Sequence, residues 1–278
     1  MVVKENGGEA VFDLHTHHER CGHAVGSLED YIEKAIAKDV QILGISDHSP
    51  YFFADEDQPY PGLAMAKSEF SNYVEEIMRL KKKYEGHIEL LIGVESDVFK
   101  EYIHLYGQVY ARFPLDYVIG SIHFTSPFKI LKGLDWNAAS DQERQTEFKR
   151  FMELTQLIIQ SNWVNIIGHL DRFNRGFSSF AEMLAPHMDS ILKMLAEKGV
   201  ALEVNTSGFR NSEVWYPSME VIERAHFFGL DVTFASDAHH PDRIGDGWEM
   251  VRDILRNIGY KRWVIFRQRR PVYLDIQF

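Results

Sequence analysis

Seven short apolar runs, separated by longer amphipathic segments, constrain the fold of this chain more than any other feature of its sequence. Apolar and β-branched residues in runs of this length are typical of buried strands, and the intervening segments have the periodicity of helices. Such alternation predicts an α/β fold built from βα units around a parallel sheet. The expected strands are residues 11–17, 42–48, 88–95, 117–123, 164–169, 200–205 and 232–237.

The expected helices lie between and after these runs. They are residues 28–38, 67–84, 102–111, 141–160, 180–198, 219–228 and 247–257, and a last strand-like run covers residues 263–276. Gly86, Gly199 and Gly229 are placed as C-terminal stops of three helices. No linker, low-complexity tract or repeat interrupts the 278 residues, so we expect residues 1–278 to form a single domain, a size that α/β barrels routinely reach.

Composition and charge exclude several classes of protein. The chain is 45% hydrophobic and 26% charged, which is usual for a globular protein with a sizeable core. Its net charge of -11 argues against binding of long nucleic acid or anionic membrane, so any anionic substrate is expected to be small. The one cysteine, Cys21, cannot form an internal disulfide, and neither a signal peptide nor an apolar run of membrane-spanning length is evident. We therefore expect a cytoplasmic protein.

Side chains that bind metals stand at the C-terminal end of almost every predicted strand. In a parallel barrel these ends share one face, where active sites are built. Because residues two apart on a strand point to the same side, His15 and His17 can bind one ion together, whereas His18 should point away. The complete set of candidate ligands is His15, His17, His23, His48, Glu95, His123, His169, Asp237 and His239.

This set of ligands is larger than one ion needs. Burying so many charged groups together would be costly without cations, which predicts two or three metal ions. Imidazole and carboxylate ligands together suit Zn, Mn or Fe. A site of this type activates water and holds phosphate oxygens, so hydrolysis of a phosphate ester is the reaction that it favours.

The motifs resemble, in order and over nearly the whole chain, those of the PHP (polymerase and histidinol phosphatase) family. They run from "DLHTH" near the start to "SDAH" near the end, and "CGHA" and "EVNTSGFR" resemble the histidinol-phosphate phosphatase branch. The resemblance implies a distorted (β/α)7 TIM-like barrel with a trinuclear metal centre at the C-terminal ends of the strands.

The resemblance also implies a role for each ligand. His15, His17, Glu95 and Asp237 would bind the first metal, Glu95 would bridge to a second held by His123 and His169, and His23, His48 and His239 would hold the third. Catalysis would depend on Glu95, Asp237 and His239 through the metal-bound hydroxide.

Two arginines follow predicted strands at places suited to the phosphate of a substrate. The planar guanidinium of arginine pairs with phosphate oxygens. Arg172 lies three residues beyond His169, and Arg210 lies in "NTSGFR"; the family resemblance supports both as phosphate ligands. Asn205 either orients a ligand or is an ordinary turn residue.

The function that these features predict is hydrolysis of L-histidinol phosphate to L-histidinol and phosphate, a step of histidine biosynthesis. The phosphoester chemistry follows from the metal ligands, and the named substrate follows from the resemblance. The alternatives are a PHP phosphoesterase for another small phosphate ester or nucleotide, an amidohydrolase-type metal hydrolase, and a non-catalytic binding module. The glutamate of the third strand and His23 favour the PHP pattern over the amidohydrolases. The oligomeric state is left open.

Overall fold

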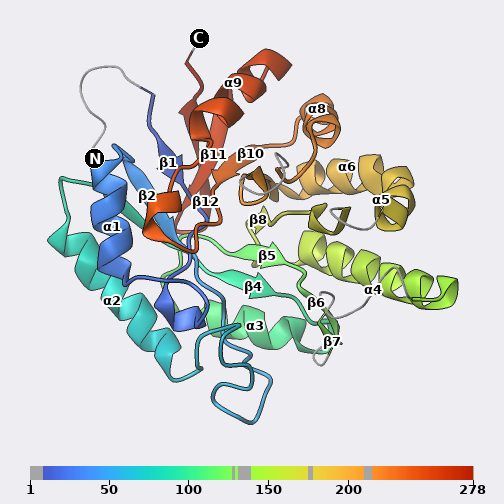
Figure 1. Ribbon diagram of the computed structural model, residues 1–278, viewed down its shortest axis with the longest axis horizontal. Helices are drawn as coiled ribbons and strands as arrows, with labels where there is room; N and C mark the ends of the chain where they lie inside the picture. The colour runs from blue at the N-terminus through green and yellow to red at the C-terminus, as the bar shows by residue number, and fades with distance from the viewer. Residues whose placement is uncertain (1–8, 127–128, 131–138, 175–177, 210–214, 278) are drawn as a thin grey trace.

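Parallel strands surrounded by helices make up the computed structural model, which describes residues 9–126, 129–130, 139–174, 178–209 and 215–277 (Figure 1). The strands are β1 (Phe12–Asp13), β2 (Ile42–Ile45), β3 (Glu89–Ile92), β4 (Glu95–Asp97), β5 (Ile119–Ser121), β6 (Phe124–Ser126), β7 (Lys129–Ile130), β8 (Ile166–Ile167), β9 (Ala201–Asn205), β10 (Val232–Ala235), β11 (Arg262–Arg267) and β12 (Arg270–Asp275). The helices are α1 (Leu28–Ala37), α2 (Glu69–Lys83), α3 (Ile103–Tyr110), α4 (Asp141–Gln160), α5 (Ser178–Leu184), α6 (Met188–Lys198), α8 (Met219–Phe227) and α9 (Trp248–Ile258). The parallel α/β fold predicted from the sequence is confirmed.

Two parallel sheets meet along two seams to form the barrel. One sheet has the order β1-β2-β3 and the other the order β10-β9-β8-β5-β4. At the first seam the chain passes directly from β3 to β4, and Val94 accepts a hydrogen bond from Ile119 N at 2.9 Å. At the second seam Leu14 N donates to Phe234 O at 3.3 Å, and Thr16 forms a parallel bridge with Ala238. The strands thus surround a common interior.

The ring of Tyr117, which is fully buried, crosses the interior of the barrel from β5 toward β1. Its hydroxyl donates to the Leu14 carbonyl at 2.5 Å. A Cβ at Gly44 would lie 2.1 Å from the Tyr117 hydroxyl oxygen, and a Cβ at Gly93 would lie 2.3 Å from the Tyr117 ring. Both glycines are therefore required, because only a residue without a side chain leaves room for this ring.

Helix ends follow signals present in the sequence. Ser27 begins α1 with a capping box to Asp30, and Ser140 begins α4 with the same arrangement to Glu143. Gly86, Gly199 and Gly229, the predicted stops, all have positive φ angles. No helix in the described part of the chain has the length and apolar character needed to cross a lipid bilayer.

Three predicted elements differ from the structure. The third strand is interrupted after Ile92: β3 pairs with β2, and β4 pairs with β5, while Glu95 keeps an isolated parallel bridge to His48 beyond the end of β2. The helix expected at 180–198 is two helices, α5 and α6, separated by a 3-10 turn at Ala185–His187 that contains Pro186. A proline within a helix removes one backbone donor and clashes with the preceding turn. The run at 263–276 is a hairpin of β11 and β12 rather than one strand.

Candidate metal centre

The nine predicted metal ligands gather at the C-terminal ends of the parallel strands. Most of them lie two to four residues beyond the last residue of a strand, and Glu95 is the first residue of β4. His23 reaches the same place from the segment that follows a 3-10 turn at Glu19–Cys21. His15, His17 and Glu95 are at most 1% exposed, so this end of the barrel encloses ionisable groups almost completely.

The Glu95 carboxylate lies among five imidazole rings. Its Oε2 atom is 2.9 Å from His48 Nδ1, 3.3 Å from His15 Nε2 and 3.5 Å from His17 Nε2. Its Oε1 atom is 3.0 Å from His169 Nε2 and 3.5 Å from His123 Nε2. One carboxylate thus contacts histidines that come from four different strand ends.

A second carboxylate, that of Asp237, lies on the other side of His17. Asp237 Oδ1 is 3.0 Å from His17 Nε2, 3.8 Å from His15 Nε2 and 3.5 Å from His239 Nδ1. His239 Nε2 in turn lies 3.0 Å from His23 Nε2. His23 is therefore connected to the cluster through His239.

Several combinations of these residues bring their ligand atoms within 4.8 Å of one another. They are His15, His17 and Asp237; His48, Glu95 and His123; and His17, His48 and His239. A further group joins His17 and Asp47 to Cys21, whose buried thiol donates to the His18 carbonyl at 3.1 Å. Burial raises the pKa of the Cys21 thiol, which favours its neutral form.

The donor atoms fit divalent cations. His15 Nε2 and Glu95 Oε2 are buried, and neither has a hydrogen-bond partner of acceptable geometry among the described residues. Buried polar atoms without partners are costly, and a cation between them would satisfy both. Nitrogen and carboxylate donors in this mixture suit zinc and similar transition metals.

Three further carboxylates, which the sequence analysis missed, lie behind the histidines. Glu203 Oε2 is 2.6 Å from His15 Nδ1, and Asp47 Oδ1 and Asp97 Oδ1 each lie 3.2 Å from the Nδ1 atom of a histidine, His17 and His123 respectively. A carboxylate behind Nδ1 favours the proton there, so that Nε2 keeps a lone pair directed into the cluster. Alternation along β9 was an available signal, because Glu203 and Asn205 point to the same side.

The electrostatics of the cluster favour the metal-binding forms of Glu95, His48 and His239, but not that of His17. Burial would raise the pKa of Glu95, but His48 and His15 lower it well below its usual value, so the carboxylate stays ionised. Burial lowers the pKa of His48 to about 4 and that of His239 to about 3, which keeps both rings neutral. Burial would lower the pKa of His17 as well, but hydrogen bonds that the protonated ring donates to Asp237 and Asp47 raise it to about 9. Metal binding at His17 would therefore release a proton.

The other predicted residues have separate positions. Arg172 Nη1 lies 3.4 Å from His123 Nε2, at the edge of the cluster. Asn205 donates to Glu203 at 2.7 Å and to Asp237 at 3.3 Å. His18 points to Asp47, with Nδ1 2.5 Å from Oδ2. Arg210 lies outside the described residues.

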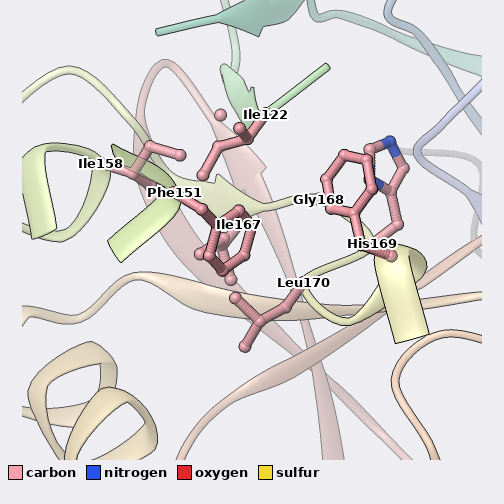
Figure 2. Close-up of a pocket in the computed structure, with 9 residues that line it drawn as sticks. Ile122, Phe151, Ile158, Ile167, Gly168, His169 and Leu170 are labelled. Atoms are coloured by element: carbon pink, nitrogen blue, oxygen red, sulfur yellow. The ribbon is translucent and has the colours of Figure 1, made fainter. Parts of the chain in front are cut away.

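Apolar packing holds the loop that carries His169. Figure 2 shows Ile122, Phe151, Ile158, Ile167 and Leu170 gathered around a small pocket, with the His169 ring at its edge. The free volume is about 10 Å³, room for one water at most. A Cβ at Gly168 would lie 2.4 Å from Ser121 Oγ, so this glycine permits β5 and β8 to approach closely just before His169.

The sequence of this chain is similar to a known domain family and to several known proteins. Residues 13–207 match the family model described as PHP domain. A probable histidinol-phosphatase of Deinococcus radiodurans is 28% identical over 264 residues, which cover 93% of this chain and 97% of the relative. The histidinol-phosphatase of Bacillus subtilis is 25% identical over 260 residues, which cover 85% of this chain and 96% of the relative.

A solved structure shares the fold. The crystal structure of histidinol phosphate phosphatase from Lactococcus lactis, complexed with zinc, L-histidinol and phosphate, matches with a TM-score of 0.76. The match has 20% sequence identity and covers 94% of this chain and 98% of the other. This likeness confirms the TIM-like barrel that the sequence predicted.

Proposed function

Because the chain belongs to the PHP domain family, we propose that it is a metal-dependent phosphatase that hydrolyses L-histidinol phosphate to L-histidinol and phosphate. The relatives named histidinol-phosphatase support the substrate, since they align with this chain over most of their length and of its own. The structure of the Lactococcus lactis protein, with zinc, L-histidinol and phosphate bound, supports both the metal requirement and the class of ligand.

The observation that carries this proposal is the position of Glu95. Its two oxygens lie within 3.5 Å of nitrogen atoms from five histidines, and Asp237 extends the same cluster toward His239. A buried carboxylate among neutral or partly charged imidazoles is what a bridged metal site requires and has little value in a purely structural core.

The proposed ligands are the nine residues of the cluster, and they would hold two or three divalent ions, which we expect to be Zn, Mn or Fe. When bound, such ions activate water near neutral pH and neutralise charge on the phosphate oxygens. Glu203, Asp47 and Asp97 fix the tautomers of His15, His17 and His123, and Arg172 pairs with the phosphate as it enters beside His123. Arg210 stays a prediction as a second phosphate ligand.

The test is release of phosphate from L-histidinol phosphate beside a panel of nucleotides and sugar phosphates. Each assay is run with added Mn or Zn and with a chelator as control. A strong preference for histidinol phosphate that the chelator abolishes is the expected result. Activity confined to another ester would keep the metal-dependent phosphatase and discard the substrate, and inactivity of the metal-loaded protein across the panel would refute the phosphatase proposal.

A further inference from the structure

A groove on the outside of the barrel lies between α3 and the C-terminal end of α4, two helices that Figure 1 shows at the periphery of the molecule. Its volume is about 980 Å³, at the upper end of the range of small-molecule sites. Tyr110, Phe113, Leu157, Trp163 and Arg269 are among the residues that line it. None of the nine residues of the metal cluster does, so the groove is a separate feature.

The indole of Trp163 forms a fixed aromatic wall of this groove. Its Nε1 donates to the Ile103 carbonyl at 3.2 Å, and its ring packs edge-on against Tyr110 with centroids 5.4 Å apart. A Cβ at Gly107 would lie 2.7 Å from Trp163 Cδ1. The helix therefore carries a glycine where the indole lies against it, and the indole is held rigidly with only 7% of its residue's surface exposed where it lines the groove.

Arg269 stands at one end of the groove on a tightly held turn. Gln268 and Arg269 both have positive φ, 50° and 66°, in the two-residue turn between β11 and β12. Asp116 holds this turn, because its Oδ1 accepts from Gln268 N and its carbonyl accepts from Arg269 N, each at 2.9 Å. Non-glycine residues in this conformation are strained, and backbone strain of this kind is often found at functional sites.

The guanidinium of Arg269 has N–H groups that no carboxylate of the described residues accepts. It donates to the Trp163 carbonyl, and within the described ranges no carboxylate oxygen lies within 4.0 Å of it. Burial lowers the pKa of Arg269, since the charge has lost water without gaining an acidic partner. Arg267, two residues earlier, makes two hydrogen bonds of 2.5 and 2.7 Å with Glu89. In the described part of the chain, Arg267 thus has an acidic partner and Arg269 has none.

We propose that this groove binds a small aromatic carboxylate, with its carboxylate on Arg269 and its ring against Trp163. A planar guanidinium matches a carboxylate through two parallel hydrogen bonds. A phosphate dianion would need more positive charge, and among the residues that the structure describes no lysine or second arginine lines the groove. The proposal stands apart from the phosphatase activity, because binding can be measured without turnover.

The experiment is calorimetric titration of the metal-loaded protein with three probes. Benzoate carries both the ring and the carboxylate, benzyl alcohol keeps only the ring, and acetate keeps only the charge. We expect benzoate to saturate with a dissociation constant of about 1 mM or lower and the other two to bind at least roughly tenfold more weakly. Arg269→Gln should weaken benzoate binding at least roughly tenfold.

Two variants make this result specific. Arg270→Gln removes an exposed arginine from the same hairpin that does not line the groove, and it should bind benzoate like the unmodified protein. Arg269→Lys keeps the charge but lacks the planar fork, so its affinity for benzoate should fall between that of the unmodified protein and that of Arg269→Gln. Circular dichroism checks that each variant is folded. If Arg269→Gln binds benzoate as tightly as the unmodified protein, benzoate binds at another place, such as the metal centre, and the proposal is overturned. Absence of saturable benzoate binding overturns it as well.

Discussion

Replacing Glu203 with glutamine is expected to weaken metal binding through His15 while leaving the barrel folded. Glu203 is fully buried, and its two oxygens have different partners. Oε2 lies 2.6 Å from His15 Nδ1, whereas Oε1 accepts from His169 N at 3.1 Å and from the Asn205 amide at 2.7 Å. All three partners are donors when Nδ1 carries the proton, and a carboxylate can accept from all of them.

A glutamine side chain has one acceptor oxygen, whereas the donors lie on two sides: His15 Nδ1 on one, and His169 N and the Asn205 amide on the other. If its oxygen faces His15, its amide group meets the N–H groups of His169 and Asn205. If the amide is reversed, it donates to His15 Nδ1 and moves the ring proton to Nε2, which then cannot bind a metal ion. Loss of such an outer carboxylate typically lowers metal affinity by roughly 10- to 100-fold, which corresponds to about 1.4 to 2.8 kcal/mol.

The assay is a zinc titration against a competing chelator, with phosphate release measured on the same samples. Glu197→Gln is the matched control, because Glu197 lies on α6, is exposed and is 3.9 Å from its lysine partner. Excess zinc should restore much of the turnover of Glu203→Gln, and thermal unfolding of the metal-free proteins should differ little. If the folded Glu203→Gln protein binds zinc as tightly as the unmodified protein, the assignment of Glu203 as a positioning residue is wrong.

Three other changes test the site. Glu95→Gln removes the shared carboxylate charge and should abolish turnover while the circular dichroism spectrum stays unchanged; an active variant would contradict the ligand assignment. Arg172→Lys should lower kcat/KM for histidinol phosphate by roughly tenfold or more, chiefly through KM, because lysine lacks the planar fork that pairs with phosphate oxygens. Gly168→Ala should cost about 1 to 3 kcal/mol of stability in urea unfolding, since its Cβ would lie 2.4 Å from Ser121 Oγ, and adding Ser121→Ala should recover part of the loss.

The structure brings the nine predicted ligands together, and the sequence could indicate them because most are chemically distinctive side chains at the end of an apolar run. Neither Glu203 nor Asp47 was found in this way. Glu203 lies inside β9, where it looked like the body of a strand, and its role depends on the parallel pairing that sets β9 beside β8 and β10. Asp47 precedes a predicted ligand, and only the folded chain shows that it faces His17 and His18. Partners far apart in sequence follow from strand order, which periodicity does not give.

The hairpin of β11 and β12 was missed for a different reason. Two-residue hairpin turns usually contain glycine, asparagine or aspartate, because both central residues need positive φ. Here Gln268 and Arg269 take those positions, and the turn is stabilised from outside by Asp116. Local sequence preference therefore gave no signal, and a tertiary contact decides the conformation.

The interruption of the third strand explains why Glu95 can serve as the centre of the cluster. Glu95 pairs with Ile119 of β5 on one side and keeps a parallel bridge to His48, beyond the end of β2, on the other, so the first residue of β4 stands between the two sheets. Glu95 Oε2 faces the histidines that follow β1 and β2, and Oε1 faces those that follow β5 and β8. The break in the sheet, which periodicity did not reveal, is thus the feature that lets a single carboxylate connect the histidines of both halves of the barrel.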